Sequence, residues 1–406
     1  MPVWHEAAKK WVADGRLVML GVIQEQHADR CRLFAQWQRF GWPILHDPIN
    51  LLELQAVPIV VAIDEHGIVR AVRPDVETFE ADFLNRTFAD DASQPDPPAL
   101  TPLGEDPGDP TRIDAVREQA SNQSTANAWR SLGDALAIWA GADGHDEALA
   151  AYERALALGP DDGNTLFRLG VIYRMRFDSP GRRAGDFQLA VDYWGRALAT
   201  DPNQYIWRRR IQQYGPRLDK PYPFYDWVRE AAAEVRARGE QPIALAVEPT
   251  GAEIAHPSKE FGASAGAAVS PDPQGRIHRD QGGLIRVEVA VVPAEVRGGE
   301  TARVHVTFFP NPDVKAHWNN ESEPLRLWID PPEGWRVSDR LLAAPQGDRP
   351  ETNEIRRLDF EVEAPSGGHG VARAAAYALY YVCEDVGGTC LFLRQDIEIA
   401  VPIGAE

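Results

Sequence analysis

The first 88 residues alternate between helical and strand-like spacings of apolar side chains. Residues 16–23 (RLVMLGVI) form a short apolar run typical of a buried strand, and residues 27–40 return to a helical spacing. Residues 59–72 predict two strands joined by an Asp-Glu-His-Gly turn. Alternating helices and strands favour an α/β layer over residues 1–88. A helical spacing also runs over the first dozen residues, at Trp4, Ala7, Ala8 and Trp11.

Residues 89–110 are acidic and proline-rich, which predicts a linker without a core, and residues 111–240 are helical. A pattern of large and small apolar residues occurs twice in the helical region. It comprises Trp129, Leu132, Gly133, Ala148, Tyr152, Ala155 and Pro160, then Leu169, Gly170, Tyr173, Ala190, Trp194, Ala197 and Pro202. The pattern resembles the tetratricopeptide repeat, which implies stacked helix pairs that recruit a protein partner. We interpret its large residues as core rather than as ligand contacts.

Residues 241–406 are dominated by strand signals. Alternating apolar residues fill 284–292 and 301–309, which are separated by Gly298-Gly299. Further short strands follow, among them 355–362 and a pair near the C-terminus. Six or seven short strands with turn signals predict an antiparallel, immunoglobulin-like β-sandwich.

Two of the three cysteines, Cys383 and Cys390, lie at the tip of that C-terminal pair of strands. The strand before them is rich in tyrosine, and Gly387-Gly388 supplies a turn between them. A hairpin would hold the cysteines face to face, with Cα atoms about 4.5–5.5 Å apart, which permits a disulfide. Three interpretations stay open: an exchangeable redox pair, a structural disulfide, or two thiols that never pair.

The residues around the pair refine these interpretations. Glu384 and Asp385 disfavour a thiolate at Cys383, so the pair is better suited to be an oxidised bond that a partner thiolate attacks. The acidic residues would also disfavour glutathione and favour a partner with a basic surface. Cys390 alternates in phase with Arg394, Asp396 and Glu398, which predicts that it faces water.

The cysteine hairpin resembles the N-terminal immunoglobulin-like domain of DsbD-type thiol:disulfide interchange proteins. The resemblance covers roughly residues 285–403 and rests on Cys383-Glu-Asp-Val-Gly-Gly-Thr-Cys390 after the tyrosine-rich strand. The spacing in that family is usually one residue shorter. The resemblance implies exchange chemistry for Cys383 and Cys390.

The N-terminal segment resembles a thioredoxin-like domain of the TlpA/ResA or redoxin type. The matching residues are Gly21-Val-Ile, Trp42-Pro-Ile-Leu-His-Asp47, and Val57-Pro58 followed by Asp64-Glu-His-Gly67. The resemblance implies that Pro58 is cis and is a remnant of an active site. The family's Cys-x-x-Cys and the strand before it are absent from this sequence. We therefore expect a truncated start or a degenerate domain, and no catalysis by this segment as it stands.

Cys31 is the third cysteine, on the second predicted helix. Arg30, Arg32 and His27 surround it in the sequence, which would lower its thiol pKa. We interpret it as an incidental helix cysteine.

Composition and charge argue against several classes of partner and site. The 406 residues carry a formal net charge of −19, which argues against nucleic acid and anionic membranes as partners. The sequence shows no apolar run long enough to span a membrane and no secretory signal at its start. The histidines lack ligand spacing, so we expect neither a metal site nor a cofactor; they include His278, His305, His317 and His369.

The sequence therefore predicts a multidomain α/β, all-α and all-β chain. The expected division is 1–88 (truncated thioredoxin-like), 89–110 (linker), 111–240 (helical repeats) and 241–406 (immunoglobulin-like sandwich). The predicted function is thiol–disulfide exchange or electron relay by Cys383 and Cys390, with a partner of the thioredoxin family and an extracytoplasmic location if the start is truncated. The alternative is a non-enzymatic interaction scaffold with a structural disulfide.

Overall fold

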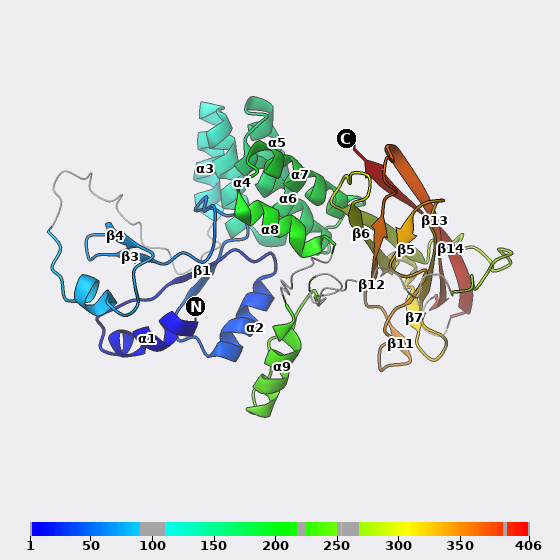
Figure 1. Cartoon of the computed structure of the whole chain (residues 1–406), viewed down its shortest axis with the longest axis horizontal. Helices are drawn as coiled ribbons and strands as arrows, with labels where there is room; N and C mark the ends of the chain where they lie inside the picture. The colour runs from blue at the N-terminus through cyan, green and yellow to red at the C-terminus, as the bar shows by residue number, and fades with distance from the viewer. Residues whose placement is uncertain are drawn as a thin grey trace. The chain divides into compact units, whose positions relative to one another are not determined.

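The computed structural model describes residues 2–89, 110–216, 225–249, 253, 268–384 and 388–404. They form two compact units, and each is described by itself. The first comprises Met1–Gly181, Ala197–Arg208 and Trp227–Glu248; the second comprises Arg182–Arg196, Arg209–Asp226 and Pro249–Glu406. The predicted mixture of helices and antiparallel sheets is confirmed (Figure 1). The predicted division into four segments stays a prediction, and most of its linker lies outside the described residues.

The N-terminal part of the first unit alternates helix and strand as expected. Its elements are α1 (Pro2–Ala13), β1 (Gly21–Ile23), α2 (Ala28–Gln38), β2 (Ile44–His46), β3 (Val61–Ile63), β4 (Val69–Val72) and η1 (Glu80–Leu84). β1 and β2 pair in parallel, and β3 and β4 pair antiparallel. Ala8 and Trp11 of α1 pack in one apolar cluster with Ala62 and Phe79. The Val57–Pro58 peptide is cis, as the resemblance implies.

The strand expected over residues 16–23 is shorter than predicted. Strand pairing begins only at Gly21, opposite Ile44. Val18 is 88% exposed and Leu20 is also exposed. An apolar run therefore did not suffice here, because a strand also needs a neighbouring strand along its whole length.

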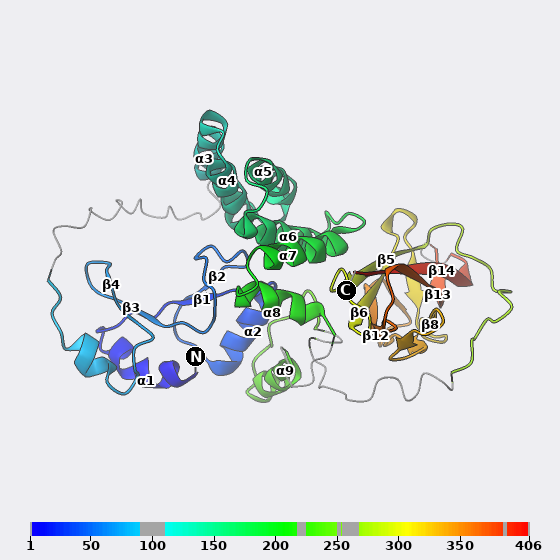
Figure 2. The ribbon, with the colours of Figure 1, turned by 45° about the horizontal axis from the view of Figure 1, so that its top comes forward.

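Two helices of the first unit begin at side-chain caps that the sequence contains. The bounds of the later helices of this unit are α3 (Pro110–Gln123), α4 (Ala126–Trp139), η2 (Gly141–Gly144), α5 (His145–Leu158), α6 (Gly163–Phe177) and α9 (Trp227–Ala237). The Thr125 side chain accepts from the amide of Ala128 at the start of α4, and Asp162 caps α6 in the same way. α3 packs on α4, α4 on α5, and α5 on α6 (Figures 1 and 2). Two further helices contribute residues to both units: α7 (Asp186–Thr200) and α8 (Tyr205–Tyr214).

A small residue allows α4 and α5 to approach closely. A Cβ atom at Gly133 would lie 2.5 Å from the Tyr152 ring, so only glycine fits there. Leu132, Tyr152 and Tyr173 are buried, as predicted for core residues. Trp129 is only half-buried, and the guanidinium of Arg154 covers its ring instead.

The second unit contains two antiparallel sheets. One has the order β5-β6-β12-β9, and the other has the order β10-β8-β13-β7-β11 with β14 paired to β13. The strands are β5 (Ile285–Val292), β6 (Thr301–Pro310), β7 (His317–Asn319), β8 (Arg326–Asp330), β9 (Arg336–Val337), β10 (Leu341–Ala343), β11 (Glu351–Thr352), β12 (Arg356–Glu363), β13 (Gly370–Cys383) and β14 (Cys390–Ile403). Both sheets contribute to one apolar core, which includes Val304, Phe308, Ile329 and Ala376. Period-2 alternation along β5 and β6 supplies its inward side chains, with Val289 opposite Val306 and Val291 opposite Val304.

Candidate functional site

The two C-terminal cysteines form a disulfide across the β13–β14 hairpin. The strand register sets Cys383 directly opposite Cys390, and their Cα atoms are 4.0 Å apart. The amide of Glu384 donates to the carbonyl of Thr389 at 3.3 Å, so the next pair carries the ladder hydrogen bond. The cysteines thus occupy a non-hydrogen-bonded pair, where facing side chains are closest. This pairing excludes two permanently separate thiols. Part of the predicted turn, including Gly387, lies outside the described residues.

The two sulfur-bearing residues differ in their exposure. Cys390 is exposed, as its alternation with Asp396 and Glu398 predicted, whereas Cys383 is only 1% exposed. Among the described strands of this sheet, β14 pairs with β13 alone and has isolated bridges to Arg279 and Val296 farther along, while β13 lies between β14 and the strands β7 and β8. The position of each strand in the sheet therefore buries Cys383 and leaves Cys390 accessible.

His317 is the neighbour of the disulfide that the sequence did not reveal. β7 pairs antiparallel with β13 in a register that sets His317 opposite Cys383. Directly opposed residues project from the same face of a sheet, so Cys390, Cys383 and His317 form a row across three strands. The His317 Nδ1 atom lies 3.1 Å from the carbonyl of Lys315, and its Nε2 atom lies 3.5 Å from a Glu351 carboxylate oxygen. Both ring nitrogens thus face acceptors.

Aromatic rings continue the same face of the hairpin. Tyr381 is paired with Phe392 in the register, two positions from the disulfide. Their ring centroids are 4.5 Å apart and the rings are stacked. This contact fixes the two strands relative to one another beside the bond.

Pro58, the predicted active-site remnant, belongs to the first unit, whereas the cysteine pair belongs to the second. Pro58 is exposed and follows the exposed Val57.

The environment of Cys31 reverses the expectation from its sequence neighbours. The pKa of its thiol is raised to about 11, first by burial and then by the negative charge of Glu25, and Arg32 offsets only part of that rise. Cys31 is 7% exposed on α2, so removal of the thiolate from water outweighs the nearby basic charge. The interpretation of an incidental helix cysteine agrees with this burial.

We expect Cys31 to resist alkylation in the folded chain. With a pKa of about 11, only about one thiol in a thousand is ionised at pH 8, and the side chain is covered. Mass spectrometry after iodoacetamide treatment should find Cys31 unmodified in the native protein and fully modified in denaturant. Rapid native-state labelling at pH 8 would contradict the burial.

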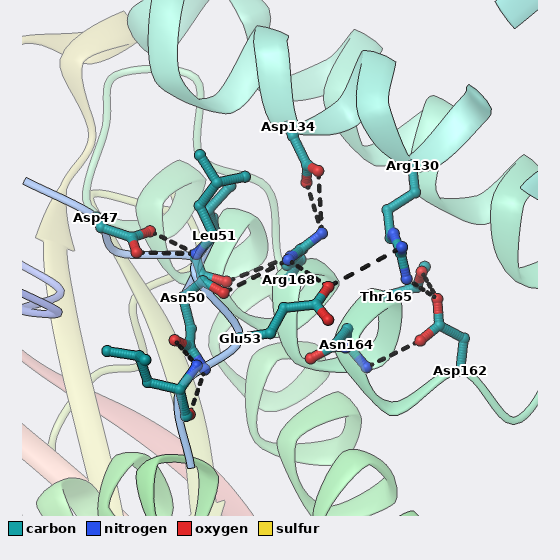
Figure 3. Close-up of polar contacts among 12 residues, drawn as sticks. Asp47, Asn50, Leu51, Glu53, Arg130, Asp134, Asp162, Asn164, Thr165 and Arg168 are labelled. Atoms are coloured by element: carbon teal, nitrogen blue, oxygen red, sulfur yellow. Dashed lines mark hydrogen bonds and ion pairs between the residues drawn. The ribbon is translucent and has the colours of Figure 1, made fainter. Parts of the chain in front are cut away.

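A second candidate site surrounds the buried Arg168 of α6 in the first unit (Figure 3). The Arg168 side chain is 2% exposed, and its Nη1 atom donates to both carboxylate oxygens of Asp134 at 3.0 and 3.1 Å. The Tyr152 hydroxyl donates to the same carboxylate at 2.8 Å. Burial raises the pKa of Asp134, and the charge of Arg168 offsets part of that rise. Asp134 and Arg168 are therefore positioned by the helices themselves.

The remaining donors of Arg168 reach a loop between β2 and β3. Its Nε atom donates to the carbonyl of Ile49 at 3.3 Å, and its Nη2 atom donates to the carbonyl of Asn50 at 3.4 Å. The Nη2 atom also donates to the carboxylate of Glu53 at 3.2 Å. Figure 3 shows Asn50 and Glu53 of the loop and Asp134 of α4 converging on this guanidinium. Nothing in the sequence pattern links Arg168 to this loop.

Over the part of the chain that the structure describes, no helix combines the length and apolarity needed to cross a bilayer. Within the same ranges, no three His, Cys, Asp or Glu side chains are arranged to hold a metal ion.

No protein-family model matches this sequence, and no curated protein matches it. The similarity to solved structures is weak, as three examples show. AvmM, which catalyses macrocyclization in alchivemycin A biosynthesis, is 14% identical over 30% of this chain and 91% of its own, with a TM-score of 0.17. A conjugate transposon protein from Bacteroides vulgatus is 17% identical over 29% of this chain and 82% of its own, with a TM-score of 0.15. BslA, a bacterial hydrophobin, is 12% identical over 30% of this chain and 98% of its own, with a TM-score of 0.16. TM-scores this low do not establish a common fold.

Proposed function

We propose that this chain carries out thiol–disulfide exchange through Cys383 and Cys390 and relays electrons from a dithiol protein. The observation that supports this best is the unequal exposure of the bond. Cys390 is exposed on the edge strand β14, and Cys383 is buried beside it. An accessible sulfur joined to a covered one gives an attacking thiolate a single point of entry.

The proposed step begins with a partner thiolate. It attacks the Cys390 Sγ atom, a new bond forms between the two sulfurs, and the Cys383–Cys390 bond breaks. The electron pair leaves on the Cys383 Sγ atom. The partner's second thiolate then attacks the mixed disulfide and releases Cys390, so the partner is oxidised and the hairpin is reduced by two electrons.

His317 lies directly opposite the buried leaving group. A thiolate at Cys383 would form next to Glu384 and away from water, which disfavours it. His317 is directly opposite Cys383, and in its protonated form it offsets that negative charge. We assign His317 this positioning role in the exchange step.

Charge around the hairpin indicates the kind of partner. Glu384 is exposed beside the bond, and the whole chain carries a net charge of −19. Both features repel an anionic thiol such as glutathione and attract a protein with basic residues around its cysteine. We propose a thioredoxin-family protein as that partner.

The proposal also assigns a role to each of the three predicted segments of the chain. We propose a degenerate thioredoxin-like layer at the N-terminus, tetratricopeptide-type helices that recruit the partner, and an immunoglobulin-like sandwich that carries the redox pair. The close α4–α5 contact through Gly133 and the shared core of the two sheets support the latter two.

Native-state reduction tests the proposal. In a Cys31→Ser background, a reduced thioredoxin should open the bond at least about tenfold faster than glutathione at equal thiol concentration. A thioredoxin that lacks its resolving cysteine should become trapped on Cys390 and not on Cys383, as read by peptide mass spectrometry. A bond that resists thioredoxin until the chain is denatured would instead support a structural disulfide in a non-enzymatic scaffold.

A further inference from the structure

A cavity lies on the outer face of strands β8, β13 and β14 in the second unit. Its volume is about 900 Å³, and it is lined by residues of these three strands and of the segment 270–279. All of them belong to the second unit. The inner face of the same strands carries Ile329, Ala376 and Ile397 in the core of the two sheets, so the cavity opens on the side away from that core.

An alanine on an interior strand forms the floor of this cavity. The register sets Ala375 of β13 opposite Asp330 of β8 on one side and opposite Glu398 of β14 on the other. Opposed residues project from the same face, so the short Ala375 side chain lies between two longer carboxylate side chains. Two strand spacings, about 10 Å, separate the main chains at Asp330 and Glu398. Ala375 is itself exposed.

The next row of side chains gives the cavity a wall that the chain holds in place. Trp328 and Tyr377 are opposite each other in this row and are 7% and 6% exposed. The Tyr377 hydroxyl accepts from the amide of Asp272 at 2.9 Å and lies 2.7 Å from the Ser270 hydroxyl. The Arg394 guanidinium covers the Tyr377 ring, 3.8 Å from its centroid. The wall is therefore formed without a ligand.

Two arginines beside this wall are held by two carboxylates. The Arg394 Nη1 atom lies 2.9 Å from Asp272, and its Nε atom lies 2.6 Å from Asp396. The Arg279 Nε atom lies 3.0 Å from the other oxygen of Asp396. An anionic ligand would have to break one of these ion pairs before it could bind either guanidinium.

One carboxylate of the cavity has no counter-charge. The third arginine, Arg373, lies 2.7 Å from Glu398. Asp330 is exposed at the end of β8, and its side chain forms no hydrogen bond or ion pair with any residue that the structure describes. Four carboxylates thus line the cavity with three guanidinium groups, and Asp330 carries the unbalanced negative charge.

These groups suit a positive charge at the end of an aliphatic stem. A carboxylate solvated only by water accepts charge-assisted hydrogen bonds from an ammonium group. The side chains of Arg373 and Glu398 are 60% and 65% exposed, so their ion pair is weak and Glu398 is free to share the same ammonium group. Ala375 and Trp328 offer apolar surface to the stem.

We propose that the cavity between Asp330 and Glu398 binds an alkylammonium group, carried either by a free amine or by a lysine side chain. The site is separate from the disulfide, because eight positions of β13, about 27 Å, lie between Ala375 and Cys383. The proposal therefore does not depend on disulfide exchange, and the two fail independently.

Ligand titration of the full chain tests the charge preference. Butylammonium should bind with a dissociation constant at least about tenfold lower than that of neutral 1-butanol, and added salt should weaken it. Amide chemical shifts of Ala375 and Glu398, followed by NMR, report binding at the cavity. N-acetyl-lysine-N-methylamide identifies the source: tighter binding than butylammonium indicates a lysine side chain, whereas equal binding indicates a free amine.

Three variants locate the binding. Asp330→Asn keeps the size of the side chain and should weaken butylammonium at least about tenfold. Asp348→Asn is the matched control, because Asp348 is an exposed carboxylate of the same unit that does not line the cavity, and it should change nothing. Ala375→Leu fills the floor and should weaken both amines at least about tenfold.

Three results would overturn the proposal. The first is binding of 1-butanol as tight as that of butylammonium, or no saturable binding of either. The second is equal affinity of the Asp330→Asn and Asp348→Asn chains for butylammonium. The third is an Ala375→Leu chain that keeps its native circular dichroism spectrum and still binds butylammonium as the unaltered chain does.

Discussion

Replacing Tyr152 by alanine is expected to lower the free energy of unfolding of the first unit by about 3–5 kcal/mol. Tyr152 is fully buried, and its ring fills the space over Gly133 where α4 and α5 are closest. The alanine side chain would leave a cavity between helices that cannot collapse freely. The Tyr152 hydroxyl also donates to the half-buried Asp134, so a hydrogen bond is lost as well.

The measurement is chemical denaturation followed by far-UV circular dichroism, which reports on the helices. Tyr152→Phe is the matched control, because it keeps the ring and removes only the hydroxyl, at a cost of about 1–3 kcal/mol. Gly133→Ala should also destabilise, since its methyl group would overlap the Tyr152 ring. A Tyr152→Ala protein as stable as the parent would show that this ring is not part of the core.

Replacing Arg303 by methionine is expected to destabilise the β5-β6-β12-β9 sheet by about 3–5 kcal/mol. Arg303 is 2% exposed on β6 and contacts two carboxylates of β12. Its Nε atom lies 2.7 Å from Asp359, and its Nη1 atom lies 3.0 Å from Glu361. Removing the cation leaves two nearly buried carboxylates side by side without their counter-charge.

Hydrogen exchange at the amides of β6 and β12 measures this effect locally. Arg286→Ala is the control, since Arg286 of the same sheet forms an exposed ion pair with Asp313 that should contribute less than about 1 kcal/mol. Adding Asp359→Leu and Glu361→Leu to Arg303→Met should restore most of the lost stability, because a well-packed apolar triad avoids the desolvation penalty. Equal hydrogen-exchange rates at these amides in Arg303→Met and Arg286→Ala would show that the buried ion pairs stabilise the sheet no more than the exposed one.

Local features of the sequence predicted several parts of this structure. The cysteine hairpin was predictable because a short glycine-containing turn and alternating strands fix which residues face each other. The exposure of Cys390 followed from the same alternation. The burial of Tyr152 was expected because the repeat pattern predicts its large apolar residues to be core. All of these depend on neighbours within about 20 positions of the chain.

Other features were decided only by the tertiary structure. The sequence indicated that Cys31 has a lowered pKa, because it showed the arginines nearby but not the burial that outweighs them. It could not show that β13 is an interior strand, which is why the burial of Cys383 was missed.

His317 and Arg168 were missed for a related reason. The register between β7 and β13 brings His317 to Cys383, and the packing of α6 brings Arg168 to residues 47–55. Both contacts join segments far apart in the sequence. Hydrophobic periodicity determines which face of an element turns inward, whereas strand order and helix packing determine which distant side chains meet there.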